Sequence, residues 1–453
     1  LDEHLDDFLA LCERERCIVA VLGKATAERQ LRVSDPHFDN TPVDLPLDVL
    51  LGKPPKMQRD VSRSQVSQPA FDTGGINIPE ALHRVLRLPA VADKTFLISI
   101  GDRSVSGLVS RDQMVGRWQT PVANASVTLS DYHGYSGEAM SMGERTPLAI
   151  LDAAAAGRIA IGEALTNLAS AWVGDLSRTV LSANWMAAAG HPGEDARLFD
   201  CVQAVGMELC PQLGITIPVG KDSLSMKTRW REDGEDRSVT APLSLIVSAF
   251  APVDDVRKTV TPDIKPCDED SYLVMIDFGG GRNRIGASAL TQVYAQTGDL
   301  GPDLDDVERF KAGFIAVQSM LEQELLLAYH DRSDGGLIVS LCEMAFAGRI
   351  GLRCDTSSLG EDALAALFAE ELGMVLQVTE GNLARVEAII QDAGLDPFYH
   401  RIGQPQQDEC LRIIHAGEAL LDEPIVDLHR AWSQTTLQMQ KLRDNPDCAQ
   451  QQF

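Results

Sequence analysis

The chain lacks a hydrophobic run long enough to cross a membrane. Its apolar stretches are interrupted every few residues by charge or glycine, and none reaches the roughly 20 residues that a bilayer-spanning helix needs. Basic residues are scarce too, because 40 Lys and Arg stand against 66 Asp and Glu, a formal net charge of −26. Such a chain repels phosphate backbones and has no basic stripe, so we expect neither a membrane nor nucleic acid as a partner.

Metal-binding and nucleotide-binding signatures of the common kinds are also missing. Cys12 and Cys17 are too far apart for a CxxC clip, and no Cys/His cluster has zinc-ligand spacing, so a reduced, cytoplasmic protein is expected. No glycine stands five residues before Gly220, which excludes a Walker P-loop there. The glycines of residues 279–286 lack the GxGxxG spacing of a dinucleotide fold.

The length of 453 residues predicts two or three domains. Residues 1–50 contain an acidic amphipathic helix and two strand-like runs, CIVAVLGKAT and RQLRVSD, which suggest the end of a domain that begins earlier. Residues 51–75 form a linker rich in Pro, Gly and Ser. Residues 76–260 and 261–430 each alternate strand-like and helical stretches, such as TFLISIG and LIVSLCEMAFAG, and residues 431–453 form a helical tail. The alternation predicts an α/β or α+β fold.

The sharpest local motif is HDRSDGG, residues 330–336, between a strand-like LLLAY and a helix starting near Leu337. A strand, a polar glycine turn and a helix form a common phosphate site, where carboxylates can hold Mg²⁺ and hydroxyl or amide groups can bind anionic oxygens. The alternative is a helix capped by Ser333 and Asp334.

A second motif, PVGKDSLSMK, residues 218–227, follows the apolar run LGITIPV. Gly220 allows a turn close to a ligand, Lys221 offers a point charge and Ser223 a hydrogen-bond donor. A hairpin with solvated charges would explain the same residues.

Two further segments carry polar groups in otherwise apolar surroundings. Glu163 and Asn167 are four residues apart, so they share one face of a predicted helix and could ligate a metal through oxygen. A partly exposed polar stripe is the alternative. Residues 182–194, which include SANWM and HPGE, predict a substrate-facing loop or a packed turn.

Taken in order, GDRSVSGLVSRDQMVG, GEALTN, SANWM, HPGE, PVGKDSLSMKTRW, HDRSDGGL and EMAFAG resemble the large phosphoribosylformylglycinamidine synthases of proteobacteria. The resemblance implies a tandem duplication of the aminoimidazole ribonucleotide synthetase fold. This chain would contain the end of the first copy, the linker, and a second copy with an N-terminal αβ domain and a C-terminal α/β domain. The first copy's remainder and the glutaminase domain would lie elsewhere in the parent polypeptide.

The same resemblance implies a ligase of purine biosynthesis, a glutamine amidotransferase of the cytoplasm. Such an enzyme uses ATP to phosphorylate the amide oxygen of formylglycinamide ribonucleotide, and ammonia from glutamine then displaces phosphate. An auxiliary site would retain ADP with magnesium. The chain alone would be inactive, because the first copy and the glutaminase triad are absent from it.

By motif match, the implied magnesium ligands are Glu163, Asn167, Asp331 and Asn124. Asn124 stands where the family usually has Asp, so a neutral amide replaces a carboxylate. The implied nucleotide contacts are Ala123, Ser333 and, in a loop that reaches the catalytic site, Gly220; Ser223 of that loop would contact the substrate.

Two other functions remain open on the residues. One is a stand-alone ATP-dependent synthetase or kinase of the same superfamily, for which a second glycine-rich phosphate loop would be expected. The other is a non-catalytic nucleotide-binding scaffold, which would retain ADP without turnover.

Overall fold

The computed structural model describes residues 2–53, 60–64, 67–101, 103 and 107–453, which fall into two compact units, Leu1–Asp60 and Val61–Phe453. In the first unit, η1 (Asp2–His4) leads into α1 (Leu5–Arg14), and β1 (Gln30–Asp35) pairs antiparallel with β2 (Asn40–Pro46) before α2 (Leu47–Leu50). Among its described residues only Cys12 is buried. This unit therefore has almost no apolar core.

The second unit begins with two helices and a six-stranded sheet. The helices are α3 (Ile78–Leu86) and α4 (Thr95–Ile98). The sheet has the order β3-β4-β5-β10-β6-β7. Its strands are β3 (Val109–Arg111), β4 (Ser126–Leu129), β5 (Gly137–Glu144), β6 (Val180–Met186), β7 (Thr216–Ser223) and β10 (Ser244–Val253). Only the β6–β7 pair is parallel. We call residues 107–253 the N-lobe.

The connections of the N-lobe contain its helices and a ribbon. They are η2 (Thr146–Ile150), α5 (Ala153–Leu168), η3 (Leu176–Arg178), α6 (Glu194–Gln203), the π-helical turn η4 (Ala204–Leu209), α7 (Cys210–Leu213) and the ribbon of β8 (Lys227–Glu232) and β9 (Glu235–Thr240). The short helix η5 (Val256–Lys258) leads out of the lobe.

A seven-stranded sheet forms the centre of residues 271–424, which we call the C-lobe. Its order is β12-β14-β11-β15-β13-β16-β17. The elements are β11 (Ser271–Asp277), α8 (Ala289–Val293), α9 (Val307–Glu322), β12 (Leu326–Asp331), α10 (Leu337–Gly348), β13 (Gly351–Asp355), η6 (Ser357–Leu359), α11 (Ala363–Phe368), β14 (Gly373–Thr379), α12 (Glu380–Asp392), η7 (Asp396–Phe398), β15 (Tyr399–Gln406), β16 (Cys410–His415) and β17 (Glu418–Pro424). Of its pairs only β13–β16 is parallel. Helices α13 (Ile425–Arg443) and α14 (Pro446–Gln452) complete the chain.

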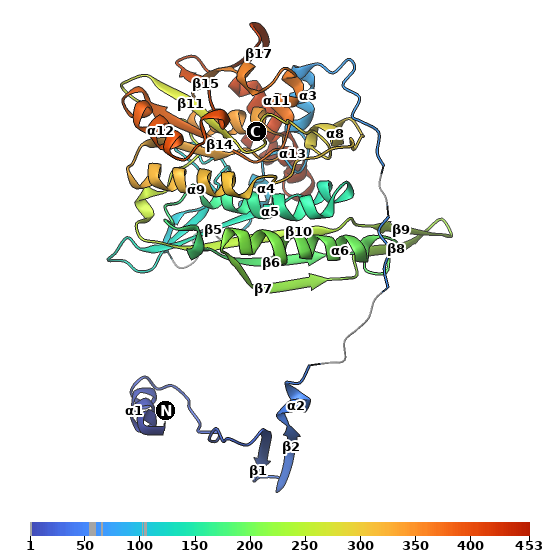
Figure 1. The fold of residues 1–453 in the computed structure, drawn as a ribbon, viewed down its shortest axis with the longest axis vertical. Coiled ribbons are helices and arrows are strands. Elements are labelled where there is room, and N and C mark those ends of the chain that lie inside the picture. The colour runs from blue at the N-terminus through green and yellow to red at the C-terminus, as the bar shows by residue number, and fades with distance from the viewer. Residues whose placement is uncertain (1, 54–59, 65–66, 102, 104–106) are drawn as a thin grey trace. The chain divides into compact units, whose positions relative to one another are not determined.

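Helix α5 lies between the N-lobe sheet and the C-lobe (Figure 1). Its small residues permit close approach on three sides. A Cβ on Gly143 of β5 would lie 2.4 Å from the backbone nitrogen of Ala164, one on Gly157 would lie 2.7 Å from Cys201 Sγ of α6, and one on Gly162 would lie 2.2 Å from Leu372 of the C-lobe. This packing fixes the rotation of α5, and with it the direction of Glu163 and Asn167.

The first apolar core surrounds α5 and lies between the N-lobe sheet and the C-lobe sheet. A second apolar core lies on the other side of the C-lobe sheet. It joins α3, α10, α11 and α13, and its largest side chains include Phe346 and Trp432. Trp432 is buried, and its indole nitrogen donates to the carbonyl of Val91 at 2.8 Å. Helix α3 therefore packs with the C-lobe although it precedes the N-lobe in the chain.

Most strongly periodic segments form the elements that the sequence predicts, and four predicted segments do not. Residues 182–186, the first part of the predicted substrate-facing loop or turn, lie in strand β6, which pairs with β10 and β7. Residues 17–26 form no strand and are exposed, because no strand of the described residues pairs with them. Residues 95–98 of TFLISIG form helix α4 instead of a strand, since Asp93 accepts hydrogen bonds from the backbone nitrogen and the hydroxyl of Thr95. The predicted loop at residues 220–223 is part of strand β7, which pairs with β6.

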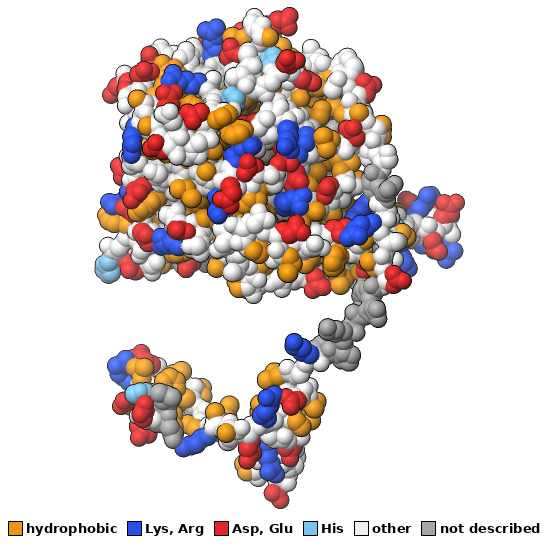
Figure 2. Space-filling model, viewed as in Figure 1, with side chains coloured by type: hydrophobic (Ala, Val, Ile, Leu, Met, Phe, Trp, Pro, Cys, Tyr) orange, Lys and Arg blue, Asp and Glu red, His pale blue; other side chains and the backbone are white. Residues whose placement is uncertain are grey.

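Charged side chains of both signs are interspersed on the face of the second unit seen in Figure 2. Among the described residues, every helix falls short of the length or the apolar character that a bilayer crossing requires.

Candidate nucleotide and metal site

Three polar side chains from distant parts of the chain meet between the two lobes. Asn124 precedes β4, Asn167 lies near the end of α5, and Asp331 is the last residue of β12. The amide nitrogen of Asn124 donates to Asn167 Oδ1 and to Asp331 Oδ1, both at 2.8 Å. We call these three residues the interlobe site. It unites three of the four predicted magnesium ligands.

Two oxygen atoms of the interlobe site have no partner. Asn124 Oδ1 and Asp331 Oδ2 are both buried and accept no hydrogen bond from any described residue. Asp331 is 2% exposed and Asn124 8%. A buried acceptor without a donor costs free energy, so these two atoms indicate a place for a ligand, a cation or water.

The fourth predicted magnesium ligand, Glu163, forms an ion pair with an arginine and does not contact the interlobe residues by a hydrogen bond. Glu163 Oε1 lies 3.6 Å from Arg145 Nη2, and its Oε2 accepts from the backbone nitrogen of Glu144 at 2.9 Å. The buried Arg145 guanidinium also pairs with Asp334 and, at 3.3 Å, with Glu370. The buried Arg145 is therefore the shared ion-pair partner of three carboxylates.

Burial raises the pKa of Glu163 and Asp334, and it raises that of Glu370 to about 7 despite the opposing charge of Arg145. The sequence alone did not suggest Arg145 or Glu370. They are 225 residues apart, and the one local signal was an arginine inside the apolar stretch MSMGERTPLAI.

Glu370 also organises the start of α10. One of its oxygens accepts from the backbone nitrogens of Ala289 at 2.9 Å and Gly335 at 2.7 Å. Helix α10 then begins after Gly336, which supplies no side-chain cap. The capped-helix alternative for the HDRSDGG motif is therefore wrong, because Asp334 pairs with Arg145.

The proposed nucleotide contacts Ser333 and Ala123 lie close in the chain to the interlobe site. Ser333 is half-buried, and its carbonyl accepts from the backbone nitrogen of Gly336 at 2.9 Å. Ala123 is adjacent to Asn124, and its side chain packs against the second core.

His330 supports Asp331 from behind. Its Nε2 lies 2.8 Å from Glu343 Oε2, and its Nδ1 lies 3.2 Å from Asp331 Oδ1. Burial alone would lower the pKa of His330, but the two carboxylates raise it to about 9. The protonated ring therefore places a positive charge beside Asp331.

Gly220 and Ser223 are not brought to the interlobe site. They lie on β7, at the opposite edge of the N-lobe sheet from β3 and β4, with β5, β10 and β6 between. Gly220 is exposed and is paired with Ala183, and Ser223 is half-buried and paired with Met186.

The interlobe residues offer a divalent cation few oxygen ligands, and one of their side chains would have to turn before it could bind the ion. Among the described residues, no three His, Cys, Asp or Glu side chains are grouped so that they could hold a metal ion. Oxygens of Asn124, Asn167 and Asp331 do converge, but the Asn124 amide nitrogen points at the other two. An N–H group cannot ligate Mg²⁺, which takes oxygen ligands, so the Asn124 amide would have to turn by half a rotation.

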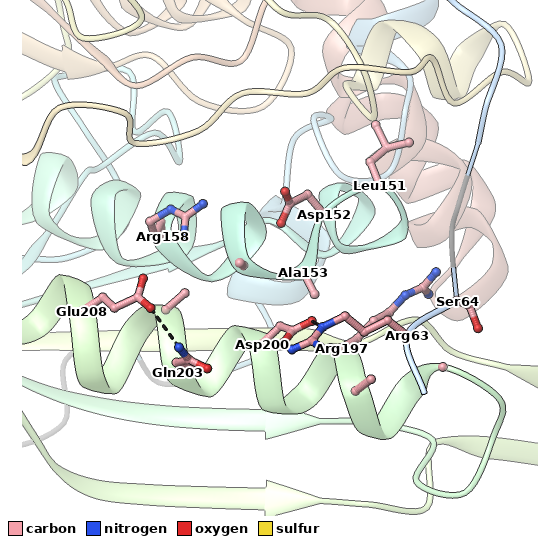
Figure 3. Close-up of a pocket in the computed structure, with 14 residues that line it drawn as sticks. Arg63, Ser64, Leu151, Asp152, Ala153, Arg158, Arg197, Asp200, Gln203 and Glu208 are labelled. Carbon is pink, nitrogen blue, oxygen red and sulfur yellow. Dashed lines mark hydrogen bonds and ion pairs between the residues drawn. The ribbon is translucent and has the colours of Figure 1, made fainter. Parts of the chain in front are cut away.

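A separate cavity, of about 450 Å³, lies between α5 and α6 (Figure 3). Its three arginines are each paired with a carboxylate: Arg63 with Asp200 at 2.7 Å, Arg158 with Asp303 at 2.6 Å and Arg197 with Glu194 at 2.7 Å. Paired cations offer little to an anionic ligand. The Arg63–Asp200 pair attaches the segment around Arg63 to α6. We therefore do not consider this cavity a candidate ligand-binding site.

Two domain families match this chain. Residues 93–252 match the FGAR-AT PurM N-like domain, and residues 274–415 match the C-terminal domain of AIR synthase related proteins. The matches cover both sides of the interlobe site, since Asn124 and Asn167 fall in the first domain and Asp331 in the second.

Solved structures with a similar fold come from Thermotoga maritima. PurL complexed with FGAR is 13% identical with a TM-score of 0.55, and the match covers 78% of this chain and 54% of that one. PurL complexed with ADP is 15% identical with a TM-score of 0.50, over 70% of this chain and 47% of that one. Phosphoribosylformylglycinamidine synthase II is 13% identical with a TM-score of 0.50, over 78% and 51%. The chain thus spans about half the length of these proteins.

Proposed function

We propose that this chain, a mixed α/β protein with a PurM N-like domain and an AIR synthase-related C-terminal domain, is the second synthetase half of a phosphoribosylformylglycinamidine synthase. The whole enzyme would be an ATP-dependent ligase that acts on formylglycinamide ribonucleotide in purine biosynthesis. The observation that carries the proposal is the meeting of Asn124, Asn167 and Asp331 between the lobes, with two unpartnered oxygens.

The interlobe site would hold ADP or ATP. The Ser333 hydroxyl, in the turn before α10, would donate to the anionic oxygens of a diphosphate. Gly335 and Gly336 both have positive φ angles, 84° and 77°, and a Cβ would lie 2.4 Å from Val339 Cγ2 or 2.7 Å from the Leu367 carbonyl oxygen, so this turn requires glycine. The similarity to a protein whose structure contains ADP supports this ligand.

Magnesium would be held by Asp331, Asn167 and Asn124, with Glu163 reaching it only if released from Arg145. When bound, the ion would neutralise phosphate charge. The residues themselves have other tasks: His330 lies beside Asp331, with its Nδ1 3.2 Å from Asp331 Oδ1, and Arg145 joins the two lobes through Glu370. With a single carboxylate freely available, this site suits retention of nucleotide better than turnover.

Gly220 and Ser223 would serve a different, catalytic site, completed by residues outside this chain. Their position at the exposed edge of the N-lobe sheet supports contact with another part of a larger enzyme. The purified 453-residue chain should therefore show no ammonia-dependent ATP hydrolysis stimulated by formylglycinamide ribonucleotide.

The direct test is nucleotide binding to the purified chain. We expect released ADP after denaturation, or saturable ADP binding with Mg²⁺ by calorimetry. Asp331→Asn should weaken it about tenfold or more, because a charge-assisted contact is lost. The matched control is Asp392→Asn, which removes the same charge from an exposed position on α12. Equal binding by the two variants, or none by the native chain, would reject the interlobe site.

A non-catalytic nucleotide-binding scaffold is the second candidate function. The Asn124 amide, which donates to one oxygen of Asn167 and one of Asp331 without a cation, favours it. ADP retained through purification, in a reconstituted enzyme whose turnover survives Asp331→Asn, would support this role over a catalytic one.

A further inference from the structure

A cavity of about 290 Å³ lies where the N-lobe, the segment after η5 and the C-lobe meet. Arg111 of β3 lines it from the N-lobe, and Leu321 at the end of α9 and Leu326 at the start of β12 line it from the C-lobe. Residues 257–261 line it in between. Its volume is near the lower limit of about 300 to 1,000 Å³ for pockets of drug-sized molecules, so it suits a smaller ligand.

The cavity is basic in a chain with a net charge of −26. Four cations line it, Arg111, Arg257, Lys258 and Lys265, against the single carboxylate of Glu324. A local concentration of positive charge on an acidic protein attracts small anions against the overall field.

Two of these cations are neutralised by carboxylates and two are not. Arg257 pairs with Asp255 at 2.6 Å, and Lys265 pairs with Asp263. Lys258 donates to the carbonyl of Glu322 at 2.8 Å and lies 4.4 Å from the centre of the Trp172 ring.

For Arg111, no carboxylate of a described residue lies within ion-pair distance. Burial lowers the pKa of Lys265, and the charge of Arg111 lowers it further against the effect of Asp263. Arg111 and Lys265 are therefore close enough to repel each other.

An unpartnered hydroxyl gives an independent indication of a ligand. Thr259 Oγ1 is buried and has no hydrogen-bond partner among the described residues. Thr259 is only 7% exposed and lines the cavity. A second hydroxyl, Thr261 Oγ1, lies 3.0 Å from Lys265 Nζ. An oxyanion in the cavity would accept from Thr259 and pair with Arg111, which presents several donors in a fixed plane.

We propose that this cavity binds a phosphate group, either free inorganic phosphate or the phosphate of a small ester, between Arg111, Lys258 and Thr259. The site is separate from the interlobe site. Its ligand joins β3 of the N-lobe to the segment that leads into the C-lobe, so the bound group holds the two lobes in register.

The test is calorimetric titration of the full 453-residue chain with sodium phosphate and with glycerol phosphate, at constant ionic strength and with chloride as the reference salt. We expect one saturable site, with binding weakened about tenfold or more by Arg111→Gln and by Thr259→Val. Arg229→Gln is the matched control, because Arg229 lies on the exposed β8–β9 ribbon and its loss changes the net charge equally. Melting midpoints in chloride check that each variant folds.

The two probes distinguish the sources of the phosphate, since the tighter of them identifies free phosphate or an ester. Asp331→Asn separates this inference from the proposed function: it should leave phosphate binding intact even if nucleotide binding is lost. Absence of saturable binding by both probes, or equal binding by Arg111→Gln and Arg229→Gln, would overturn the proposal. So would binding that Asp331→Asn abolishes and Arg111→Gln does not.

Discussion

At the scale of single residues, Asn124 decides what the interlobe site can bind. Its amide nitrogen occupies the position between two oxygens that a cation would otherwise take, and it donates at 2.8 Å to one side-chain oxygen of Asn167 and one of Asp331. A carboxylate at this position would leave three acceptors facing one another. The site would then depend on a cation.

We therefore predict that Asn124→Asp makes stability depend on a divalent cation. In EDTA the variant should lose about 1 to 3 kcal/mol of unfolding free energy, because hydrogen bonds are replaced by repulsion between carboxylates. Mg²⁺ or Mn²⁺ should restore it, while the native chain should respond little. Urea unfolding with and without metal measures both effects. A variant as stable as the native chain in EDTA, with no response to metal, would show that residue 124 does not face a cation.

Gly336 is the second residue whose type the site requires. Its φ is 77° and its ψ −168°, and a Cβ there would lie 2.7 Å from the carbonyl oxygen of Leu367. We predict that Gly336→Ala lowers the unfolding free energy by about 1 to 3 kcal/mol or more, from backbone strain plus the clash.

The control for that prediction is Gly281→Ala. Gly281 also has a positive φ, 73°, but nothing lies within 4 Å of its Cβ position. Urea unfolding should find Gly336→Ala the more destabilised of the two. Equal losses would mean that the clash at the start of α10 is relieved by movement.

At the scale of elements, the sequence predicted those whose apolar pattern is buried. Strands β10, β11, β12 and β14 and helix α10 all come from apolar runs that read clearly in the sequence. The prediction of secondary structure from the sequence was wrong where a local contact or the lack of a pairing strand determined the conformation. Residues 95–98 form a helix, and the backbone nitrogen of Thr95 donates to Asp93 at its start. Residues 220–223 form a strand because they pair with β6.

For the site as well, the sequence predicted some residues and missed others. The spacing of Glu163 and Asn167 correctly placed both on one helix, and the HDRSDGG motif correctly placed Asp331 at the end of a strand. The role of Arg145 could not be predicted, because its partners Glu163, Asp334 and Glu370 come together only when α5 and the C-lobe pack.

The Arg145 cluster predicts how stability changes with pH. The pKa of Glu370 is raised to about 7 in the folded state, mainly by burial and next by the charge of Asp334. The ordinary pKa of a Glu side chain is 4.5, so between pH 4.5 and 7 the folded state holds a proton that the unfolded state has lost. The unfolding free energy should therefore fall as the pH rises from about 4.5 through 7.

The measurement is urea unfolding at a series of pH values, for the native chain and for Glu370→Gln. The variant keeps an oxygen to accept from Ala289 and Gly335 but cannot ionise, so its profile should be flatter over this range. Glu322→Gln, at an exposed position on α9, is a control for the loss of a carboxylate elsewhere. A slope as steep in Glu370→Gln as in the native chain would assign the bound proton to Asp334 or Glu163.

At the scale of the whole molecule, nearly all the apolar core belongs to the second unit. Residues 61–453 contain both core clusters, whereas the described part of residues 1–60 buries only Cys12. The second unit is also fastened near its own beginning. Arg63 donates two hydrogen bonds to Asp200, at 2.9 and 2.7 Å, and Phe71 lies 6.3 Å from the Tyr294 ring.

We predict that deletion of residues 1–60 leaves the main thermal transition unchanged, because that segment adds little buried apolar surface. Deletion of residues 1–75 should lower the midpoint by a few degrees, since it also removes the Arg63 and Phe71 contacts. Differential scanning calorimetry of the three chains compares them directly. Arg63→Gln in the full chain should reproduce part of the second loss. A large drop on removing residues 1–60 alone would mean that the first unit contributes to folding through contacts beyond its own small core.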